Sequence, residues 1–394
     1  MNKTEQMKQT HEALGGSDGT QRCSATAEGR VGPWEGHRRW PSHASICAFG
    51  FFDLDGQRSW VIRKGLQEAG FDVSLCRTDT RGFLPKLRDL LKQWKTIGAI
   101  DALYVVFPGY FPMPLAWWLA RRRGIPVIFD VFISLYDTIV GDRALITRWH
   151  PKAWILLLVD WLSCALADVI LIDTEEHRDF FVRHYHIARE KFLVIPVGSR
   201  TDLFTARNTG RHDFPFLVRF HGSFIPLHGI ETILRAAGEL QGEDIVFELA
   251  GKGQTFASMQ KLAEQWNLTN VRFVGMKKLE EIPDFIAGAD VCLGIFGTGS
   301  KAQRVIPTKA YEIMAMGKPL ITARSPATER VFRNRQDALL VHSGNPHDLA
   351  EKIRELKTHP DLAASIAQNG RTLFLEKFQP LMIVQPIVEW LRKR

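Results

Sequence analysis

Short apolar segments alternate with longer segments of helical periodicity along the chain from Ser45 onward, and this alternation restricts the fold more than any other feature. The apolar segments are too short, and too rich in β-branched and aromatic residues, to be core helices. They are typical of buried parallel strands with helices on both faces of the sheet. The predicted strands of the first half are Ile46–Phe51, Asp72–Cys76, Ala102–Phe107, Val127–Asp130, Val169–Ile172 and Phe192–Ile195. Those of the second half are Phe216–Phe220, Ile245–Ala250, Val271–Val274, Val291–Ile295, Pro319–Thr322 and Ala338–Val341.

Two similar α/β halves are therefore predicted in tandem. The length of 394 residues agrees, because single cores stop growing at about 250–300 residues. We expect a first Rossmann-like domain at residues 44–200 and a second at residues 216–378. Between them, residues 201–215 lose the periodicity and gain glycine and proline, which predicts a linker.

The two ends of the chain differ in character. Residues 1–43 are polar and glycine-containing without the apolar core of a signal peptide, so we predict a disordered tail. Residues 379–394 carry apolar residues at roughly helical spacing and are predicted to form a C-terminal helix. The sequence does not indicate which domain that helix packs on.

Charge and composition narrow the class of ligand. The formal net charge of +8 favours anionic partners such as phosphates or anionic lipids. The five cysteines are scattered without a C-x-x-C pair, which argues against a zinc site or disulfide framework and for a reducing cytoplasm. The most apolar stretch contains Asp160 and Asp168, so no transmembrane helix is predicted. Dispersed basic residues argue against nucleic-acid binding, and the lack of G-x-G-x-x-G after a strand argues against a dehydrogenase.

Two glycine-containing strand ends in the second half are candidate phosphate sites. Gly222 and Ser223 follow one predicted strand, with His228 close behind, and Gly251 and Gly253 follow the next. In doubly wound sheets, ligands bind at such strand ends, where free backbone N–H groups and helix N-termini receive anions. Alternatively, these glycines are ordinary turn residues.

The most informative segment is a basic loop that leads into a short predicted helix. Arg304 and Lys309 supply cations that can offset a diphosphate, and they are our candidate catalytic cations. Thr308 stands at the predicted helix start, and Glu312 can accept hydrogen bonds from ribose hydroxyls. Glu312 lies among apolar residues, which favours a ligand-binding acid over a solvated surface acid.

This segment resembles a known family. Residues Ile306–Thr322 are similar to the donor-binding signature of the retaining family 4 (group 1) glycosyltransferases, which have the GT-B fold. Residues 167–198 resemble the end of the family's first domain, and residues 220–230 the start of its second. The resemblance implies two Rossmann-like domains that face each other across a cleft. It also implies sugar transfer from a nucleoside-diphosphate donor with retention of anomeric configuration, without a cofactor or catalytic metal.

The chain departs from the family pattern in its donor site. Glu312 matches the second of the family's two glutamates, which implies contact with the donor ribose, but Arg304 stands where the first would lie. Ser223 and His228 stand near the positions at which family members carry an arginine and a lysine against the diphosphate. We hypothesise that Lys309 and Arg304 supply this charge instead.

The first domain is expected to hold the acceptor. Gly56 and Arg58 follow its first predicted strand, where glycine permits close approach of a substrate and arginine can meet a phosphate. Alternatively, Gly56 only forms a turn.

A second acceptor loop follows the strand Val127–Asp130. Asp130, Ser134 and Asp137 are candidates for binding sugar hydroxyls, with Asp130 as the candidate catalytic group that stabilises a cationic transition state. The alternative is that one or more of them cap the following segment. Phe132 stands where many family members carry a histidine, so a catalytic histidine is not carried over.

The resulting prediction is a hexosyltransferase that acts on a glycan or lipid-linked acceptor in cell-surface polysaccharide synthesis. Residues 117–123, with two tryptophans and three arginines, suit a lipid headgroup layer, or alternatively a helix packed on the sheet. We therefore expect a cytoplasmic protein with a peripheral contact at the inner face of the membrane. Two alternatives remain: a sugar-nucleotide epimerase, and a noncatalytic nucleotide-binding subunit, which the missing glutamate and histidine favour.

Overall fold

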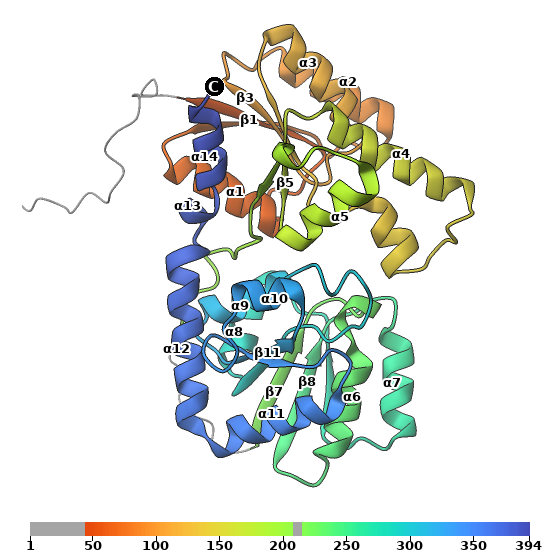
Figure 1. Ribbon diagram of the computed structural model, residues 1–394, viewed down its shortest axis with the longest axis vertical. Helices are drawn as coiled ribbons and strands as arrows, with labels where there is room; N and C mark the ends of the chain where they lie inside the picture. Colours follow the sequence, from red (N-terminus) through yellow and green to blue (C-terminus); the bar gives the residue numbers. More distant parts are fainter. Residues whose placement is uncertain (1–43, 208–214) are drawn as a thin grey trace, which may run out of the picture. The chain divides into compact units, whose positions relative to one another are not determined.

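The computed structural model describes residues 44–207 and 215–394 (Figure 1). The predicted N-terminal tail and the middle of the predicted linker, residues 208–214, lie outside the described residues. The described residues form two six-stranded parallel sheets with strand orders β2-β1-β3-β4-β5-β6 and β12-β11-β10-β7-β8-β9. The predicted α/β class with two Rossmann-like domains is confirmed.

The first sheet is built from residues 45–194, with helices between its strands. Its strands are β1 (Ser45–Gly50), β2 (Asp72–Arg77), β3 (Ala102–Val105), β4 (Val127–Asp130), β5 (Val169–Ile172) and β6 (Phe192–Val194). The intervening helices are α1 (Gln57–Glu68), α2 (Phe83–Trp94), α3 (Met113–Arg123), the π-helix η1 (Asp137–Asp142), α4 (Pro151–Leu166), α5 (Glu175–Tyr185) and the 3₁₀ turn η2 (Arg189–Lys191).

The second sheet repeats this plan, with strands between residues 216 and 341 and helices that extend to residue 377. Its strands are β7 (Phe216–His221), β8 (Ile245–Ala250), β9 (Val271–Gly275), β10 (Val291–Leu293), β11 (Leu320–Ala323) and β12 (Leu339–Val341). Its helices are α6 (Ile230–Glu239), α7 (Phe256–Gln265), α8 (Ile282–Ala287), α9 (Thr308–Ala315), α10 (Pro326–Val331), α11 (Pro346–Thr358) and α12 (Pro360–Lys377), with 3₁₀ turns η3 (Pro226–His228) and η4 (Leu279–Glu281).

Every predicted strand is present, with ends that differ by at most two residues. Central strands such as β3, β4 and β5 are buried along their whole length, which explains why they read as continuous apolar runs. The expected short helix before Gly317 is also confirmed as α9, which follows Pro307 and ends where Gly317 adopts a φ of +64°.

The C-terminal segment forms two helices instead of the predicted one. They are α13 (Pro380–Ile383) and α14 (Gln385–Arg392), and Pro386 in the first turn of α14 explains the break, because proline cannot donate the hydrogen bond that a continuous helix needs. The segment returns to the first sheet, where α13 packs on α1 and α14 on β6 (Figure 1). At Gly65 of α1, a Cβ atom would lie 2.2 Å from the Pro380 carbonyl oxygen, so glycine permits this close approach.

Candidate functional site

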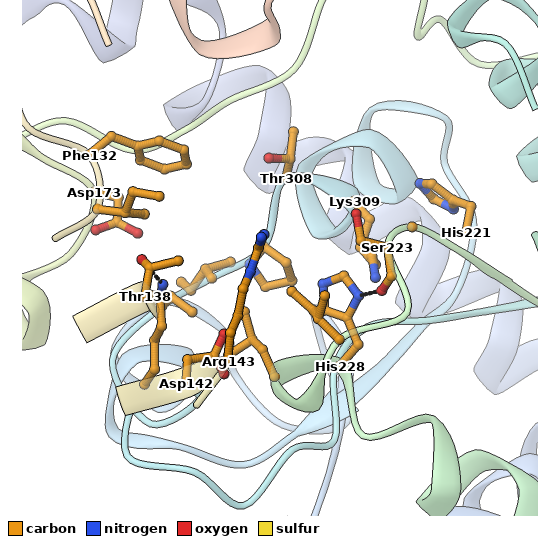
Figure 2. A pocket seen from close by; sticks show the side chains of 18 of the residues that line it. Phe132, Thr138, Asp142, Arg143, Asp173, His221, Ser223, His228, Thr308 and Lys309 are labelled. Carbon is orange, nitrogen blue, oxygen red and sulfur yellow. Dashed lines mark hydrogen bonds between the residues drawn. The ribbon is translucent and has the colours of Figure 1, made fainter. Parts of the chain in front are cut away.

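A cavity of about 330 Å³ lies at the carboxyl ends of the two sheets (Figure 2). Its walls come from the segments that follow β4 and β5 in the first sheet and β7 and β10 in the second. Six of the residues expected to bind the donor line it. They are Gly222, Ser223, His228, Thr308, Lys309 and Glu312.

Lys309, in the first turn of α9, brings a buried cation to this cavity. Its side chain is 5% exposed, and its Nζ atom has no hydrogen-bond partner among the described residues. The Nζ atom lies 3.8 Å from the centre of the Phe220 ring, and Figure 2 shows it close to Ser223 and His228. Burial lowers the pKa of the Lys309 ammonium well below its usual value, and Glu312 offsets part of that effect. A buried cation without a partner is costly, and an anion in the cavity would offset the cost.

His228 is a neutral neighbour of this lysine. Its Nδ1 atom contacts the carbonyl oxygen of Ser223 (Figure 2). Burial first, and then Lys309, lowers the pKa of the His228 imidazole well below its usual value. Because a carbonyl can only accept, Nδ1 donates to it, and Nε2 of the neutral ring is left as an acceptor. His228 therefore does not replace the family's cation at this position.

Glu312 is held by residues of both halves of the chain. Its Oε2 atom lies 2.6 Å from Nε2 of His221, at the end of β7, and its Oε1 atom accepts a hydrogen bond from Gln57 of α1. The carboxylate is 5% exposed. The sequence prediction that Glu312 faces the site is consistent with this placement, but Gln57 and His221 were not predicted.

Arg304 and Asp137, which we expected to bind the donor and the acceptor, bind each other. The Nη2 atom of Arg304 lies 2.8 Å from Oδ2 of Asp137, and the guanidinium lies 4.1 Å from the centre of the Phe180 ring. Neither residue is among the described residues that line the cavity. The positive charge of Arg304, which we expected to offset a ligand phosphate, is therefore offset by the Asp137 carboxylate.

Lys301, in the same basic loop, does line the cavity and was missed. Its Nζ atom donates to Oγ1 of Thr138 at 2.7 Å. Burial lowers the pKa of the Lys301 ammonium, and Asp137 and Asp142 raise it. The loop carries several cations, and the sequence contains no signal for which of them faces inward. Other cavity residues missed by the sequence reasoning are Asp142, Arg143 and Asp173.

Asp130 and Arg58 form a buried ion pair, and neither is among the described residues that line the cavity. Nε of Arg58 donates to Oδ1 of Asp130 at 2.8 Å, and the same guanidinium donates to the Ile195 carbonyl at 2.9 Å. Burial raises the pKa of the Asp130 carboxyl, and Arg58 opposes that rise. This pair ties α1 to β4 and to the end of β6. The catalytic role expected for Asp130 and the phosphate-binding role expected for Arg58 stay predictions.

Phe132 lines the cavity just beyond this pair. It adopts a φ of +47°, an uncommon conformation for a residue with a side chain. Its ring centre lies 4.9 Å from the Arg58 guanidinium. An aromatic ring therefore occupies the position at which the resemblance led us to look for a histidine.

Ser134 is a cap, which is the alternative that the sequence left open. It is buried, its hydroxyl donates to Asp160 Oδ2 at 2.7 Å, and it accepts from the backbone N–H of Asp137 at 2.8 Å, at the start of η1. Asp160 also accepts from the N–H groups of Leu135 and Tyr136, both at 3.0 Å. This carboxylate of α4 thus holds the loop that carries Asp137 and Thr138.

The remaining predicted glycines shape the backbone and do not line the cavity. Gly56 precedes α1 with a φ of −57°, which any residue can adopt. A Cβ atom on Gly251 would lie 1.9 Å from the Gly222 carbonyl oxygen, and one on Gly253 would lie 2.5 Å from that of Phe224. Glycine is therefore required at Gly251 and Gly253 so that the loops after β7 and β8 can pass each other.

Within residues 44–207 and 215–394, no cluster of three or more histidine, cysteine, aspartate or glutamate side chains is placed to hold a metal ion. In the same ranges, no helix combines the length and apolarity needed to cross a bilayer. The cysteines of these ranges are free and buried, and Cys23 lies outside them.

The sequence and the structure are both similar to known glycosyltransferases. Residues 205–373 match the family model described as glycosyl transferases group 1. An uncharacterised glycosyltransferase of Methanocaldococcus jannaschii is 27% identical over 43% of this chain and 45% of its own length. D-inositol 3-phosphate glycosyltransferase of Streptomyces avermitilis is 24% identical over 69% of this chain and 63% of its own length. The chain thus spans less than two thirds of each of these relatives.

The fold itself has close counterparts among solved structures. The structure of HepE from Anabaena, in complex with UDP and glucose, matches with a TM-score of 0.65 and 16% identity, over 90% of this chain and 100% of that one. This likeness shows that the chain has the GT-B fold. The segment at residues 205–373 that matches the family model supports the glycosyltransferase group 1 family.

Proposed function

We propose that this protein is a retaining glycosyltransferase of group 1 that binds a nucleoside-diphosphate sugar in the cavity between its two sheets. The observation that carries the proposal is the buried amino group of Lys309, which has no hydrogen-bond partner among the described residues and lies beside the turn formed by Gly222 and Ser223. A diphosphate at this point would offset the buried charge and form charge-assisted hydrogen bonds with it. Backbone N–H groups at the start of α9 favour the same anion.

The other residues of the cavity fit the remaining parts of such a donor. Glu312 presents a carboxylate that suits ribose hydroxyls, provided that Gln57 exchanges its hydrogen bond for one to the sugar. In the transfer, the bond between the anomeric carbon and the diphosphate breaks, and a bond to an acceptor oxygen forms on the same face. The leaving diphosphate takes the acceptor's proton, and Lys309 stabilises its charge. Arg304, another of our first catalytic candidates, contributes only through the loops it holds.

The nature of the donor and acceptor is a further part of the proposal. HepE is solved with UDP-glucose as well as with UDP, which supports testing uridine nucleotides and hexoses first. We propose a glycan or lipid-linked acceptor bound against the first domain, where Phe132, Thr138 and Asp173 line the cavity. The proposed setting is cell-surface polysaccharide synthesis at the inner face of the membrane, as the family resemblance implies.

A thermal-shift screen with UDP, GDP, ADP and their sugars tests the donor site. A ligand at about 100 times its Kd stabilises the folded state by about 2.7 kcal/mol. We expect one nucleotide series to raise the Tm of the wild type, and Lys309→Met to abolish that rise. Lys318→Met is the matched control, because Lys318 lies in the same signature but donates to the Ala289 carbonyl at 3.0 Å instead of facing the cavity. No response to any nucleotide, or an equal response in Lys309→Met, would overturn the proposal.

Product analysis with a labelled donor separates transfer from its two alternatives. Incorporation of label into an acceptor supports the transferase. Epimerised donor sugar without an acceptor assigns an epimerase, and donor binding with neither transfer nor hydrolysis assigns a noncatalytic subunit.

A further inference from the structure

Helix α4 and the segment before it expose an unusual set of large apolar side chains. We call this set the α4 surface: Trp149, Trp154, Ile155, Leu158, Trp161 and Leu162. Their exposed fractions range from 38% for Leu162 to 72% for Trp149. Contiguous exposed apolar side chains of this size mark a contact with another molecule or a membrane.

The five helical members of the α4 surface share one side of α4. They follow the spacing i, i+1, i+4, i+7 and i+8 from Trp154, which places them on a single face. The opposite face is buried in the fold and contains Ala153, Asp160, Ser163 and Cys164. The helix is thus inverted relative to an ordinary surface helix, with its carboxylate inside and its tryptophans outside.

The exposed lysine and arginine side chains of the segment from Arg143 to Leu166 have no exposed carboxylate within the same segment. From Arg143 to Leu166, the cations Arg143, Arg148 and Lys152 are exposed, and Asp160, the single carboxylate of that segment, is fully buried. The Arg148 guanidinium lies 4.9 Å from the ring centre of Trp149. Tryptophans flanked by arginine and lysine, without carboxylates, match the boundary between lipid headgroups and acyl chains.

The α4 surface lies next to the segment that the sequence indicated, residues 117–123 of α3. In α3, which packs beside α4 (Figure 1), Arg121 pairs with Asp168 at 3.1 Å. Arg123 donates to the Gly98 carbonyl at 2.8 Å and lies over the Trp94 ring. Both arginines therefore contact other parts of the fold, whereas Arg122 lies over the ring of Trp118, which is 42% exposed. The larger exposed apolar face belongs to α4.

We propose that the α4 surface docks on an anionic lipid bilayer. Its apolar side chains enter the boundary between headgroups and acyl chains, and Arg148 and Lys152 contact lipid phosphates. A symmetric contact with a second copy fits less well, because it would bring these cations against their own copies with no exposed carboxylate to offset them. Since Arg143 also lines the cavity, docking would bring the cavity wall close to the lipid surface, a consequence that matters for catalysis only if the proposed function holds.

Vesicle flotation of the full chain tests the docking directly. We expect the wild type to float with vesicles of about 30% phosphatidylglycerol in phosphatidylcholine and to bind pure phosphatidylcholine more weakly. Trp154→Gln/Leu158→Gln/Trp161→Gln is expected to weaken binding by at least about tenfold. Arg148→Gln/Lys152→Gln is expected to weaken it by about 25-fold, since each lost cation contributes about fivefold. The matched control, Met276→Gln/Leu375→Gln, also replaces exposed apolar side chains, outside α4, and is expected to bind as the wild type.

A second measurement needs no variant. Brominated acyl chains quench tryptophans that enter the bilayer, so we expect lipid-dependent quenching of the unmodified protein. Absence of flotation and quenching, or unchanged binding by the triple variant, would overturn the proposal. So would a wild-type dimer that the triple variant dissociates and that does not bind vesicles, because the α4 surface would then contact a second copy. None of these outcomes depends on nucleotide binding, so the docking and the proposed function fail separately.

Discussion

The guanidinium of Arg304 and the carboxylate of Asp137, 167 positions apart in the chain, lie 2.8 Å from each other in a largely buried ion pair. Arg304 belongs to the basic loop after β10, and Asp137 begins η1 after β4. The hydroxyl of Thr174, after β5, also contacts the carbonyl of Arg304. The loops at the carboxyl ends of the two sheets are thus joined beside the cavity, and the pair is placed to maintain the shape of the cavity.

This pair is expected to be strongly coupled. Arg304→Gln and Asp137→Asn each leave one buried charge without its partner, so each is expected to lower the free energy of unfolding by about 3 kcal/mol. The double variant Arg304→Gln/Asp137→Asn should lose at least about 1 kcal/mol less than the sum of the two. Urea denaturation measures all three values. The exposed pair Arg235–Glu231 is the control, with an expected loss below about 0.5 kcal/mol per substitution; strictly additive losses for Arg304 and Asp137 would contradict their coupling.

The lowered pKa of Lys309 predicts proton uptake when a diphosphate binds. The folded pKa lies well below the usual lysine value, so between that pKa and about 10.4 the folded protein holds fewer protons than the unfolded chain. Stability contributed by this group is therefore complete above about pH 10.4 and is lost as the pH falls through the unfolded value towards the folded one. A bound diphosphate favours the ammonium and raises its pKa, so binding at a pH between the free and bound values takes up a proton.

Isothermal titration calorimetry in two buffers of different ionisation enthalpy measures this uptake. Measured at several pH values up to about 10.4, nucleotide binding to the wild type and to Lys318→Met is expected to take up protons at the pH values that lie between the free and the bound pKa of Lys309. Lys309→Met is expected to bind weakly with no uptake, and to unfold at a higher urea concentration than the wild type without ligand, because the cost of burying its cation is gone. Binding by the wild type without proton uptake would refute the role of Lys309.

Gly251 is predicted to be a structural requirement and not a ligand contact. In Gly251→Ala, the new methyl group would meet the Gly222 carbonyl at 1.9 Å, and the φ of +145° is itself unfavourable for alanine. We expect a loss of more than about 3 kcal/mol in the free energy of unfolding, measured without nucleotide. Gly98→Ala is the control, because a Cβ atom there meets nothing within 4 Å. A stable Gly251→Ala protein that has lost only nucleotide binding would restore the ligand-contact hypothesis.

The strands of the two sheets were predictable because the pattern of apolar residues that marks a strand depends only on neighbouring positions in the chain. Burial on both faces makes β4 or β5 a continuous apolar run, whereas apolar residues recur every three or four positions where the chain enters a helix. That several predicted residues of the second half line one cavity was predictable for a related reason. Ser223 and Lys309 each lie close to a strand end or helix start that the sequence marks, and strand ends of a parallel sheet meet at one edge.

The first-domain side of the cavity was harder to predict, because the sequence does not show which charged residues form ion pairs with each other. Asp130 and Arg58 are 72 positions apart, and nothing in the sequence indicates that they neutralise each other. The exposed face of α4 was also not predictable from the sequence, because α4 is apolar on more than one side. Asp160 determines which face of α4 is buried, because its carboxylate accepts four hydrogen bonds inside the fold. Three of the donors belong to the segment after β4, and the fourth is the hydroxyl of Tyr185.

The sequence by itself determined the α/β class, the strands, the two-domain division and the cluster of donor-site candidates around Lys309, because periodicity and strand ends are properties of neighbouring residues. Only the tertiary structure decided which charges are free. The charges of Arg304, Arg58 and Asp137 are offset within the fold, whereas the Nζ atom of Lys309 is buried beside the cavity without a hydrogen-bond partner among the described residues. The physical reason is that the cost of a buried charge depends on what lies within a few ångströms of it, and that is fixed by contacts between segments far apart in the chain.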